Sequence, residues 1–227
     1  MKIRLLLILT VFTAVNHLQS QTKPFRFGFR VAPVLSWISP DAEQYHYDGL
    51  TLGFSWGLMA DITLADNYFI KSGFSYDYVN GKLSFPYQKD TSETGTLFRK
   101  YKYRYIEVPL TIKLRTNKFG KFAYFGEVGL GTAFKIRAKS NDEFKPGNEG
   151  ETTRWESDIS SETPFIKESL IAGIGTEYFL DQSTSLLLEL TFSNSLSDIL
   201  DGDNTLYPDI GQKGYLYGFQ LNIGILF

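Results

Sequence analysis

The sequence predicts an all-β protein: an eight-stranded antiparallel up-and-down transmembrane β-barrel of the outer-membrane type. Three observations lead to this prediction. Long segments alternate between apolar and polar or small residues, the connections between them are alternately short and long, and the chain ends on an aromatic residue, Phe227. A strand in a soluble domain has about 5 to 6 residues, whereas a tilted strand that crosses a bilayer needs roughly 9 to 11. Segments of this length favour a strand that faces lipid.

The first twenty residues have the pattern of a secretory signal peptide. Lys2 and Arg4 precede an apolar run from Leu5 to Val15, and a short polar stretch follows. This run is shorter than the about 20 apolar residues of a membrane-spanning helix. We therefore expect residues 1–20 to be removed and residues 21–227 to form one barrel. Losing two of the 23 basic residues leaves 21 against 25 acidic ones, a net charge of −4 that gives no indication of nucleic-acid binding.

The first four strands are expected at Phe25–Trp37, Leu50–Leu64, Tyr68–Pro86 and Lys100–Arg115. The second shows the alternation most fully, because an apolar residue occupies every second position along its whole length. In the first strand Arg26 and Arg30 share a face, and in the third Lys71 and Asp77 do. In the fourth, Glu107 points into the lumen while Ile106, Val108, Leu110, Ile112 and Leu114 face lipid.

The last four strands are expected at Lys121–Arg137, Pro164–Leu180, Thr184–Ile199 and Gly214–Phe227. The fifth strand of the barrel is rich in glycine, which leaves room for neighbouring side chains in a narrow interior. The eighth places tyrosine, leucine, isoleucine and phenylalanine on one face and glycine, glutamine and asparagine on the other. Such a strand fits lipid outside and a narrow lumen inside.

The connections between the expected strands alternate strictly between long and short along the chain. The short ones are residues 65–67, 116–120 and 181–183, and the long ones are residues 38–49, 87–99, 138–163 and 200–213. Outer-membrane barrels have short periplasmic turns and long extracellular loops, so we expect both termini in the periplasm. A soluble lipocalin-like barrel also has eight alternating strands. The charged and small residues opposite the apolar rows argue against this alternative, because they would replace its hydrophobic core.

An eight-stranded barrel is just wide enough for side chains to fill it, so no open pore is expected. The inward rows supply charges of both signs, as pairing away from water requires: Arg26, Arg30, Asp61, Lys71, Asp77, Glu107, Lys113, Arg115, Glu127, Lys135, Arg137, Lys167, Glu177 and Glu189. The lumen polar network is assigned to Arg30, Asp61, Lys71, Glu107, Lys113, Glu127, Glu177 and Glu189.

Two details of this network can be predicted. The short connection at residues 65–67 sets the register so that Asp61 lies opposite Lys71, and these charges should attract. Counting along the strands puts Arg30 at the same middle depth as several glutamates, so we expect Arg30 to be the hub of a central ionic cluster. A structural plug is favoured over a proton path or gate.

The sequence contains few residues of the types that carry out nucleophilic or metal-dependent catalysis. The histidines are His17, in the signal segment, and His46, in the first long connection, and there is no cysteine. His46 with a neighbouring acid is the candidate for a hydrolase at the barrel rim. Asp201, Asp203 and Asn204 resemble the start of a calcium loop but lack its later glycine and glutamate. We expect no catalytic residue, metal or cofactor.

The third long connection, residues 138–163, is strongly charged, which indicates a solvated loop. Trp155 is the exception in this loop, because a tryptophan in such a setting can anchor a partner or rest against headgroups. Trp155 is therefore the candidate contact residue for a partner.

The segment Tyr105–Lys113, YIEVPLTIK, resembles the Tyr-aliphatic-Glu-aliphatic-Pro-Leu strand of the PorT family of outer-membrane barrels from Bacteroidota. The likeness continues through residues 116–119, the glycine-rich fifth strand, residues 168–170 and residues 181–185. The namesake of that family takes part in type IX secretion and gliding. The resemblance implies an outer-membrane location and, as an expectation, a part in protein secretion.

These observations lead to two expectations for function. The first is a non-enzymatic barrel that contacts outer-membrane lipid and acts as a scaffold or accessory subunit in outer-membrane assembly or secretion, with other outer-membrane or secretion-system proteins as partners. The second is a small channel or transporter for ions or small solutes.

Overall fold

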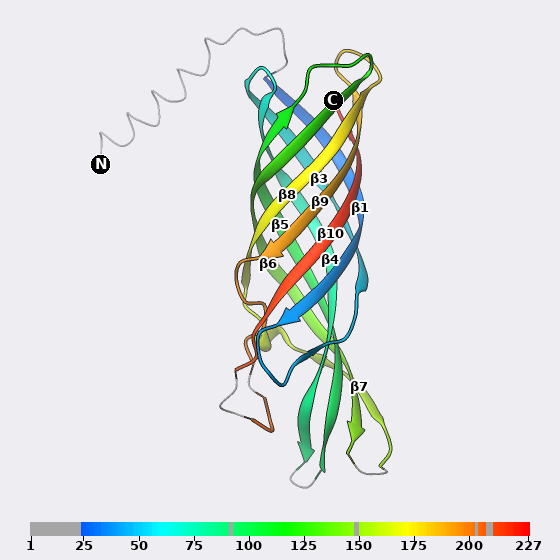
Figure 1. Cartoon of the computed structure of the whole chain (residues 1–227), viewed down its shortest axis with the longest axis vertical. Helices are drawn as coiled ribbons and strands as arrows, with labels where there is room; N and C mark the ends of the chain where they lie inside the picture. The colour runs from blue at the N-terminus through cyan, green and yellow to red at the C-terminus, as the bar shows by residue number, and fades with distance from the viewer. Residues whose placement is uncertain (1–23, 91–92, 148–149, 203, 208–210) are drawn as a thin grey trace, which may run out of the picture.

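The chain folds into strands that wind around one axis (Figure 1). The computed structural model describes residues 24–90, 93–147, 150–202, 204–207 and 211–227. Its long strands are β1 Phe25–Pro40, β3 Thr51–Ala65, β4 Tyr68–Asp90, β5 Glu93–Arg115, β6 Phe122–Pro146, β8 Ile166–Phe179, β9 Ser185–Ser195 and β10 Gly214–Leu226. The expected signal peptide, residues 1–20, lies outside the described residues.

Closure of the sheet defines the architecture. The long strands follow the order β4-β3-β1-β10-β9-β8-β6-β5, and β5 also pairs with β4, which completes a ring of eight antiparallel strands. Two short strands lie beside this ring, β2 (His46–Tyr47) on β4 and β7 (Thr153–Asp158) on β6, and a 3-10 turn, η2, covers Ser160–Glu162. Within the described ranges, no helix is long and apolar enough to span a membrane. The predicted eight-stranded barrel is confirmed.

The outer wall of the ring carries an apolar belt. On β5, Leu110 is 60% exposed, whereas Lys113 on the opposite face is fully buried. The same alternation of exposed apolar and buried polar residues recurs on β3, β8 and β9. The inside-out polarity expected from the sequence is therefore present, and the soluble lipocalin-like alternative fails because that fold would hide these rows.

The short connections and both ends of the barrel chain lie at one end of the ring, which we call the turn end. Asn67 adopts a positive φ of 69° in the β3–β4 turn, a conformation that asparagine tolerates. In the β8–β9 turn, backbone hydrogen bonds from Ser183 and Thr184 lower the pKa of Asp181 to about 2. The backbone N–H of Phe227 donates to the carbonyl of Phe27 at 2.7 Å, which fixes the last strand to the first.

The opposite end, which we call the hairpin end, differs from the sequence prediction. Residues 87–99 and 138–163 were expected to be loops, but β4 and β5 continue to Asp90 and from Glu93, and β6 continues to Pro146 and pairs with β7. Figure 1 shows the β4–β5 hairpin projecting beyond β1, β9 and β10, with β7 beside it. The hydrogen-bonded pairing of these strands continues because the inward side chains of Leu83, Leu97 and Phe144 pack together and are buried.

Arg137 is a second correction. Its position in the alternation predicts that it faces the lumen, but it is exposed on the outer wall. The register between β5 and β6 shifts there, since Arg104 pairs with Arg137 while Tyr105 pairs with Lys135. The extra residue, Ile136, forms a β-bulge, and a bulge of this kind re-aims the side chains beyond it.

We predict that Leu110→Arg destabilises the barrel by about 2–4 kcal/mol in a bilayer, because this position lies at the middle of the belt and a cation there loses its water. The measurement is urea unfolding of protein refolded into lipid vesicles, followed by gel mobility. Thr94→Arg on the same strand, at an exposed position of the hairpin end, is the control and should change stability by less than about 0.5 kcal/mol. Equal stability of the two variants would contradict a lipid-facing belt.

Candidate functional site: the filled interior of the barrel

The interior at the turn end holds a tight ionic cluster, which we call the turn-end cluster. Glu177 on β8 accepts from Arg26 at 2.9 Å, from Lys113 at 2.6 Å and from Arg115 at 3.1 Å. Asp61 on β3 contacts Arg26 at 2.9 Å and Lys113 at 2.8 Å. Three cations from β1 and β5 thus surround two carboxylates, and each carboxylate is shared, which offsets the cost of removing these charges from water.

A second cluster lies at the middle of the ring. Lys71 on β4 contacts Glu127 on β6 at 2.9 Å and Glu189 on β9 at 2.7 Å. All three side chains are buried. A single lysine therefore links strands that face each other across the lumen. Its one positive charge neutralises one of the two negative charges of the carboxylates.

The register places Asp61 opposite Lys71, as expected from the β3–β4 turn. The two side chains nevertheless form no pair with each other; Asp61 contacts Arg26 and Lys113, and Lys71 contacts Glu127 and Glu189. The expected direct attraction is therefore wrong. In a ring this narrow, a long side chain reaches partners across the lumen as easily as its neighbour on the next strand.

Arg30 is not the hub of the network. Its guanidinium donates to the side-chain amides of Gln220, at 3.2 Å, and Asn222 on β10. Among the described residues it has no carboxylate within salt-bridge distance, so the expectation of a central cluster around Arg30 is wrong. Asn222 is held in turn by Thr191, to which its amide donates at 3.1 Å, and this arrangement explains why two neutral amides occupy inward positions on β10.

At the next level toward the hairpin end, each charged side chain contacts one partner of opposite charge or a hydroxyl, and no charge is shared among several. Lys167 on β8 contacts Glu107 on β5 at 3.2 Å and donates to Ser169 at 2.8 Å. Asp77 on β4 accepts a hydrogen bond from Ser55 on β3 at 2.6 Å. The ionic groups of the turn end and the middle of the ring end at this level.

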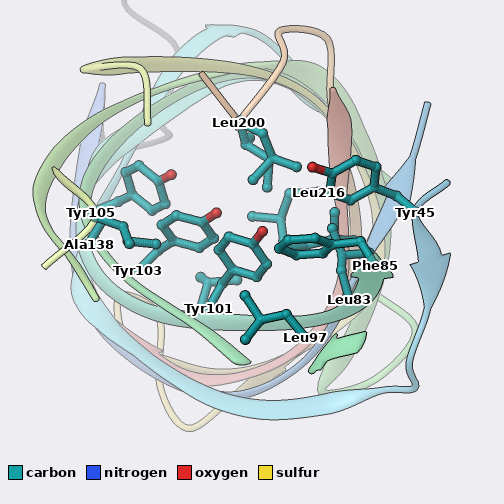
Figure 2. Packing of buried hydrophobic residues seen from close by; sticks show 14 of the residues in the cluster. Tyr45, Leu83, Phe85, Leu97, Tyr101, Tyr103, Tyr105, Ala138, Leu200 and Leu216 are labelled. Atoms are coloured by element: carbon teal, nitrogen blue, oxygen red, sulfur yellow. The ribbon is translucent and has the colours of Figure 1, made fainter. Parts of the chain in front are cut away.

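Aromatic and aliphatic side chains fill the interior beyond it. Tyr101, Tyr103 and Tyr105 on β5 stack with ring centroids 5.9 and 5.8 Å apart. Figure 2 shows their rings side by side, with the hydroxyls directed toward the middle of the ring and Leu200 and Leu216 on the far side. The hydroxyls of Tyr101 and Tyr103 are buried without a hydrogen-bond partner among the described residues. We call the buried cluster around this tyrosine stack the apolar plug; its members are Ile38, Tyr45, Val79, Leu83, Phe85, Leu97, Tyr101, Tyr103, Tyr105, Ala133, Ala138, Phe144, Ile159, Ile199, Leu200 and Leu216.

A small cavity lies in the middle of the ring. It has a volume of about 30 Å³, and its walls include Arg30, Lys71, Glu107, Glu127 and Glu189. A cavity needs roughly 10–15 Å³ to hold one water molecule, so there is space for one or two. With ionic clusters on one side and the apolar plug on the other, this cavity does not connect the two ends as a pore.

The sequence matches a model of a known protein family over residues 19–201, and the description of that family is "Outer membrane protein beta-barrel domain". The chain belongs to this family. It is an outer-membrane β-barrel protein of the bacterial type, and its exposed belt contacts lipid. No curated protein matches the chain.

Solved outer-membrane barrels resemble this barrel in fold. Neisserial surface protein A is 12% identical, with 90% of this chain and 96% of that chain covered and a TM-score of 0.44. OprG from Pseudomonas aeruginosa is 11% identical, with 90% and 97% covered and a TM-score of 0.49. Ail from Yersinia pestis is 12% identical, with 90% and 100% covered and a TM-score of 0.42.

A third ionic group fastens the hairpin end of this outer-membrane barrel. Arg99 on β5 donates from two nitrogens to Asp142 on β6, each at 2.9 Å, and from a third to Glu162 in η2 at 2.8 Å. Sequence reasoning placed Arg99 and Asp142 in loops and missed this group. The alternation of Leu97, Arg99 and Tyr101 is the signal that could have shown that the strand continues.

Trp155, the candidate contact residue, lies on β7 of the barrel. It is half-buried and packs against the apolar plug from the side of β6. It also lines an open groove of about 500 Å³ together with Phe98, Lys100 and Arg154. The charged loop expected around it is thus a paired strand, and its indole is fixed rather than free in solution.

The residues considered for catalysis and for calcium binding form no catalytic or metal-binding group among the described residues. His46 lies on β2 and is exposed, and the part of the chain that the structure describes contains no group of three His, Cys, Asp or Glu residues able to hold a metal. Asp203 of the calcium-like segment lies outside the described residues, while Asn204 donates to the Tyr45 hydroxyl at 3.0 Å.

We predict that Glu177→Gln destabilises the barrel by about 3–5 kcal/mol, because it leaves three buried cations around a neutral group. Unfolding in urea, followed by gel mobility, measures the change. Glu168→Gln on the same strand is the matched control, since that side chain is only partly buried and bonded to Thr132. If both variants unfold at the same urea concentration, the turn-end cluster does not hold the barrel together.

Proposed function

We propose that this chain is a non-enzymatic scaffold or accessory subunit in outer-membrane assembly or protein secretion. The observation that carries the proposal is the division of the molecule into a filled barrel and a rigid, projecting hairpin end. A filled barrel offers no route for a solute, whereas ordered strands that extend beyond the belt offer a surface for another protein.

The interior supports a structural role. From the turn end, the shared carboxylates, the central Lys71 cluster and the apolar plug follow one another along the axis. Each layer joins strands on opposite sides of the ring. Charges arranged for pairing in this way serve as a plug between strands.

The hairpin end supports a contact role. Arg99 and its carboxylates join β5, β6 and η2, so that the projecting strands are held before any partner binds. A preordered surface loses less conformational entropy on association than a mobile loop. The groove beside Trp155 combines an indole with charges of both signs, which suits a polar segment of a neighbouring outer-membrane protein that carries one aromatic or aliphatic anchor.

The topology proposed for the membrane puts the turn end in the periplasm and the hairpin end outside, which is the usual arrangement of short turns and long connections. The YIEVPLTIK strand and its likeness to the PorT family support membership of that group within the broader family. A part in type IX secretion follows only from that likeness.

A channel or transporter for ions or small solutes is the second candidate. The observation in its favour is the polar cavity of about 30 Å³ at the middle of the ring. Conduction would require the apolar plug and the ionic layers to separate, because single waters in the cavity do not form a continuous path.

We predict no steady conductance step when the purified barrel is inserted into a planar bilayer, since the filled interior leaves no continuous aqueous path. Replacing Tyr101 and Tyr103 by alanine should open part of the apolar plug without changing the turn-end cluster or the Lys71 cluster, and serves as the comparison. Reproducible unit steps from the unaltered protein would favour the channel and remove the scaffold.

We also predict that a photo-crosslinking amino acid at position 155, introduced into cells that contain the native membrane, forms an adduct with one defined outer-membrane protein. The matched position is Ile223 on β10, which is exposed in the lipid-facing belt and should give lipid adducts only. Lipid adducts alone at both positions would indicate a barrel that acts by itself.

A further inference from the structure

A basic surface lies on the outer wall at the hairpin end, and two of its cations, Lys82 and Lys100, also line the Trp155 groove. Its six cations come from β4, β5 and β6, and we call them the basic patch: Lys82, Lys100, Lys102, Arg104, Arg137 and Lys139. The patch begins directly beyond the apolar belt, where Ile106 on β5 is the last exposed aliphatic residue before Arg104.

The strand register sets these cations against one another. Arg104 pairs with Arg137, and Lys102 with Lys139, across β5 and β6. Lys82 pairs with Lys100 across β4 and β5. Like charges directly opposite in a sheet, with Cβ atoms about 4.5–5.5 Å apart, destabilise the pairing. Three such pairs on adjacent strands concentrate positive charge on this part of the wall, where a bound anion would relieve the repulsion.

The bulge at Ile136 contributes directly to this surface. If the strand were regular, with Ile136 paired like its neighbours, the alternation would turn Arg137 into the lumen, as the sequence prediction assumed. With it, Lys135 still faces inward and donates to the carbonyl of Ser160, while Arg137 comes out opposite Arg104. The local backbone therefore places a cation next to a cation at the edge of the belt.

The chain's own acids neutralise little of the patch. Among the described residues, its one ion pair within 4 Å joins Lys139 to Glu156 on β7. That hydrogen bond lowers the pKa of Glu156, and Lys102 and Arg137 add to the effect through their charge. Asp158 on β7 lies opposite Lys139 in the register. Asp48 and Glu143 also line the Trp155 groove beside Lys82 and Lys100, so the uncompensated charge of the patch is centred on Lys102, Arg104 and Arg137.

The position of the patch selects the kind of anion. The Arg104 guanidinium lies 5.3 Å from the ring centre of Tyr78, an aromatic residue at the boundary of the belt, which is where headgroups meet hydrocarbon. On the far side of the ring, the paired outward residues at this end are Trp37 with Tyr217 and Ser39 with Tyr215. The patch thus lies on the side of the wall formed by β4, β5 and β6, whereas the paired outward positions of β1 and β10 at this end carry aromatic residues and serine.

We propose that the basic patch binds the phosphate groups of anionic lipid headgroups in the leaflet around the hairpin end. Arginine presents a planar fork of donors that matches phosphate oxygens, and adjacent lysines add point charges. A phosphate between Arg104 and Arg137 would replace their repulsion by two charge-assisted contacts. This inference rests on the family's place in the outer membrane and is independent of the scaffold role.

Native mass spectrometry of the purified protein in an uncharged detergent tests the proposal, with bisphosphorylated lipid A as the titrated probe. The variant is Lys102→Gln with Arg137→Gln, which removes one cation from each of the two opposed pairs that join β5 and β6. The matched control is Lys118→Gln with Lys121→Gln, which removes the same charge from the turn end. Each cation near a lipid surface contributes about fivefold to binding, so the patch variant should bind lipid A about 25-fold more weakly and the control should bind as the unaltered protein does.

Three results would overturn the proposal: equal binding by the patch variant, equal binding of the same lipid after its phosphates are removed, or full displacement of the lipid by inorganic phosphate alone, which would show a site for a free ion. Thermal unfolding without lipid separates binding from folding. The patch variant should then unfold at the same temperature as the unaltered protein or higher, because repulsion is relieved. A lower temperature would assign Lys102 and Arg137 a structural role and also reject the proposal.

Discussion

Closure of the hydrogen-bonded sheet is the constraint on which the rest of this structure depends. Hydrocarbon offers no partner for a free backbone N–H or carbonyl, so a spanning sheet must return to its own first strand. Pairing of β4 with β5, and of β1 with both β3 and β10, achieves this return. Eight strands then enclose so little space that every inward side chain meets others across the axis. The ionic pairs are a consequence of closure, because water has almost no room inside.

Two kinds of side-chain packing fill the interior, from which water is nearly excluded. Toward the turn end, each buried carboxylate is shared among cations from other strands, as with Glu177. Toward the hairpin end, the tyrosine stack on β5 and facing leucines exclude water without charge. The arrangement joins strands that are distant in sequence, because Arg26 and Glu177 come from the first and sixth strands of the ring.

The period-two alternation was sufficient to predict the barrel, its inside-out polarity and the inward direction of the eight assigned network residues. It could not predict which of them pair, since Lys71 contacts Glu189 across the lumen rather than Asp61 beside it. Partner choice depends on strand tilt and side-chain reach, which local sequence does not encode. The long connections were misread for another reason: charged outward residues such as Glu143 and Lys145 hid the inward apolar positions of a continuing strand.

The single additional residue at Ile136 divides β6 into two parts that differ in phase. Before Ile136, side chains alternate between the lipid side and the lumen side of the strand. After it, the alternation continues shifted by one residue. The portion beyond the bulge can therefore exchange its side chains without disturbing the register of the portion within the bilayer. A surface that must adapt to changing surroundings is thereby separated from a wall that must stay constant.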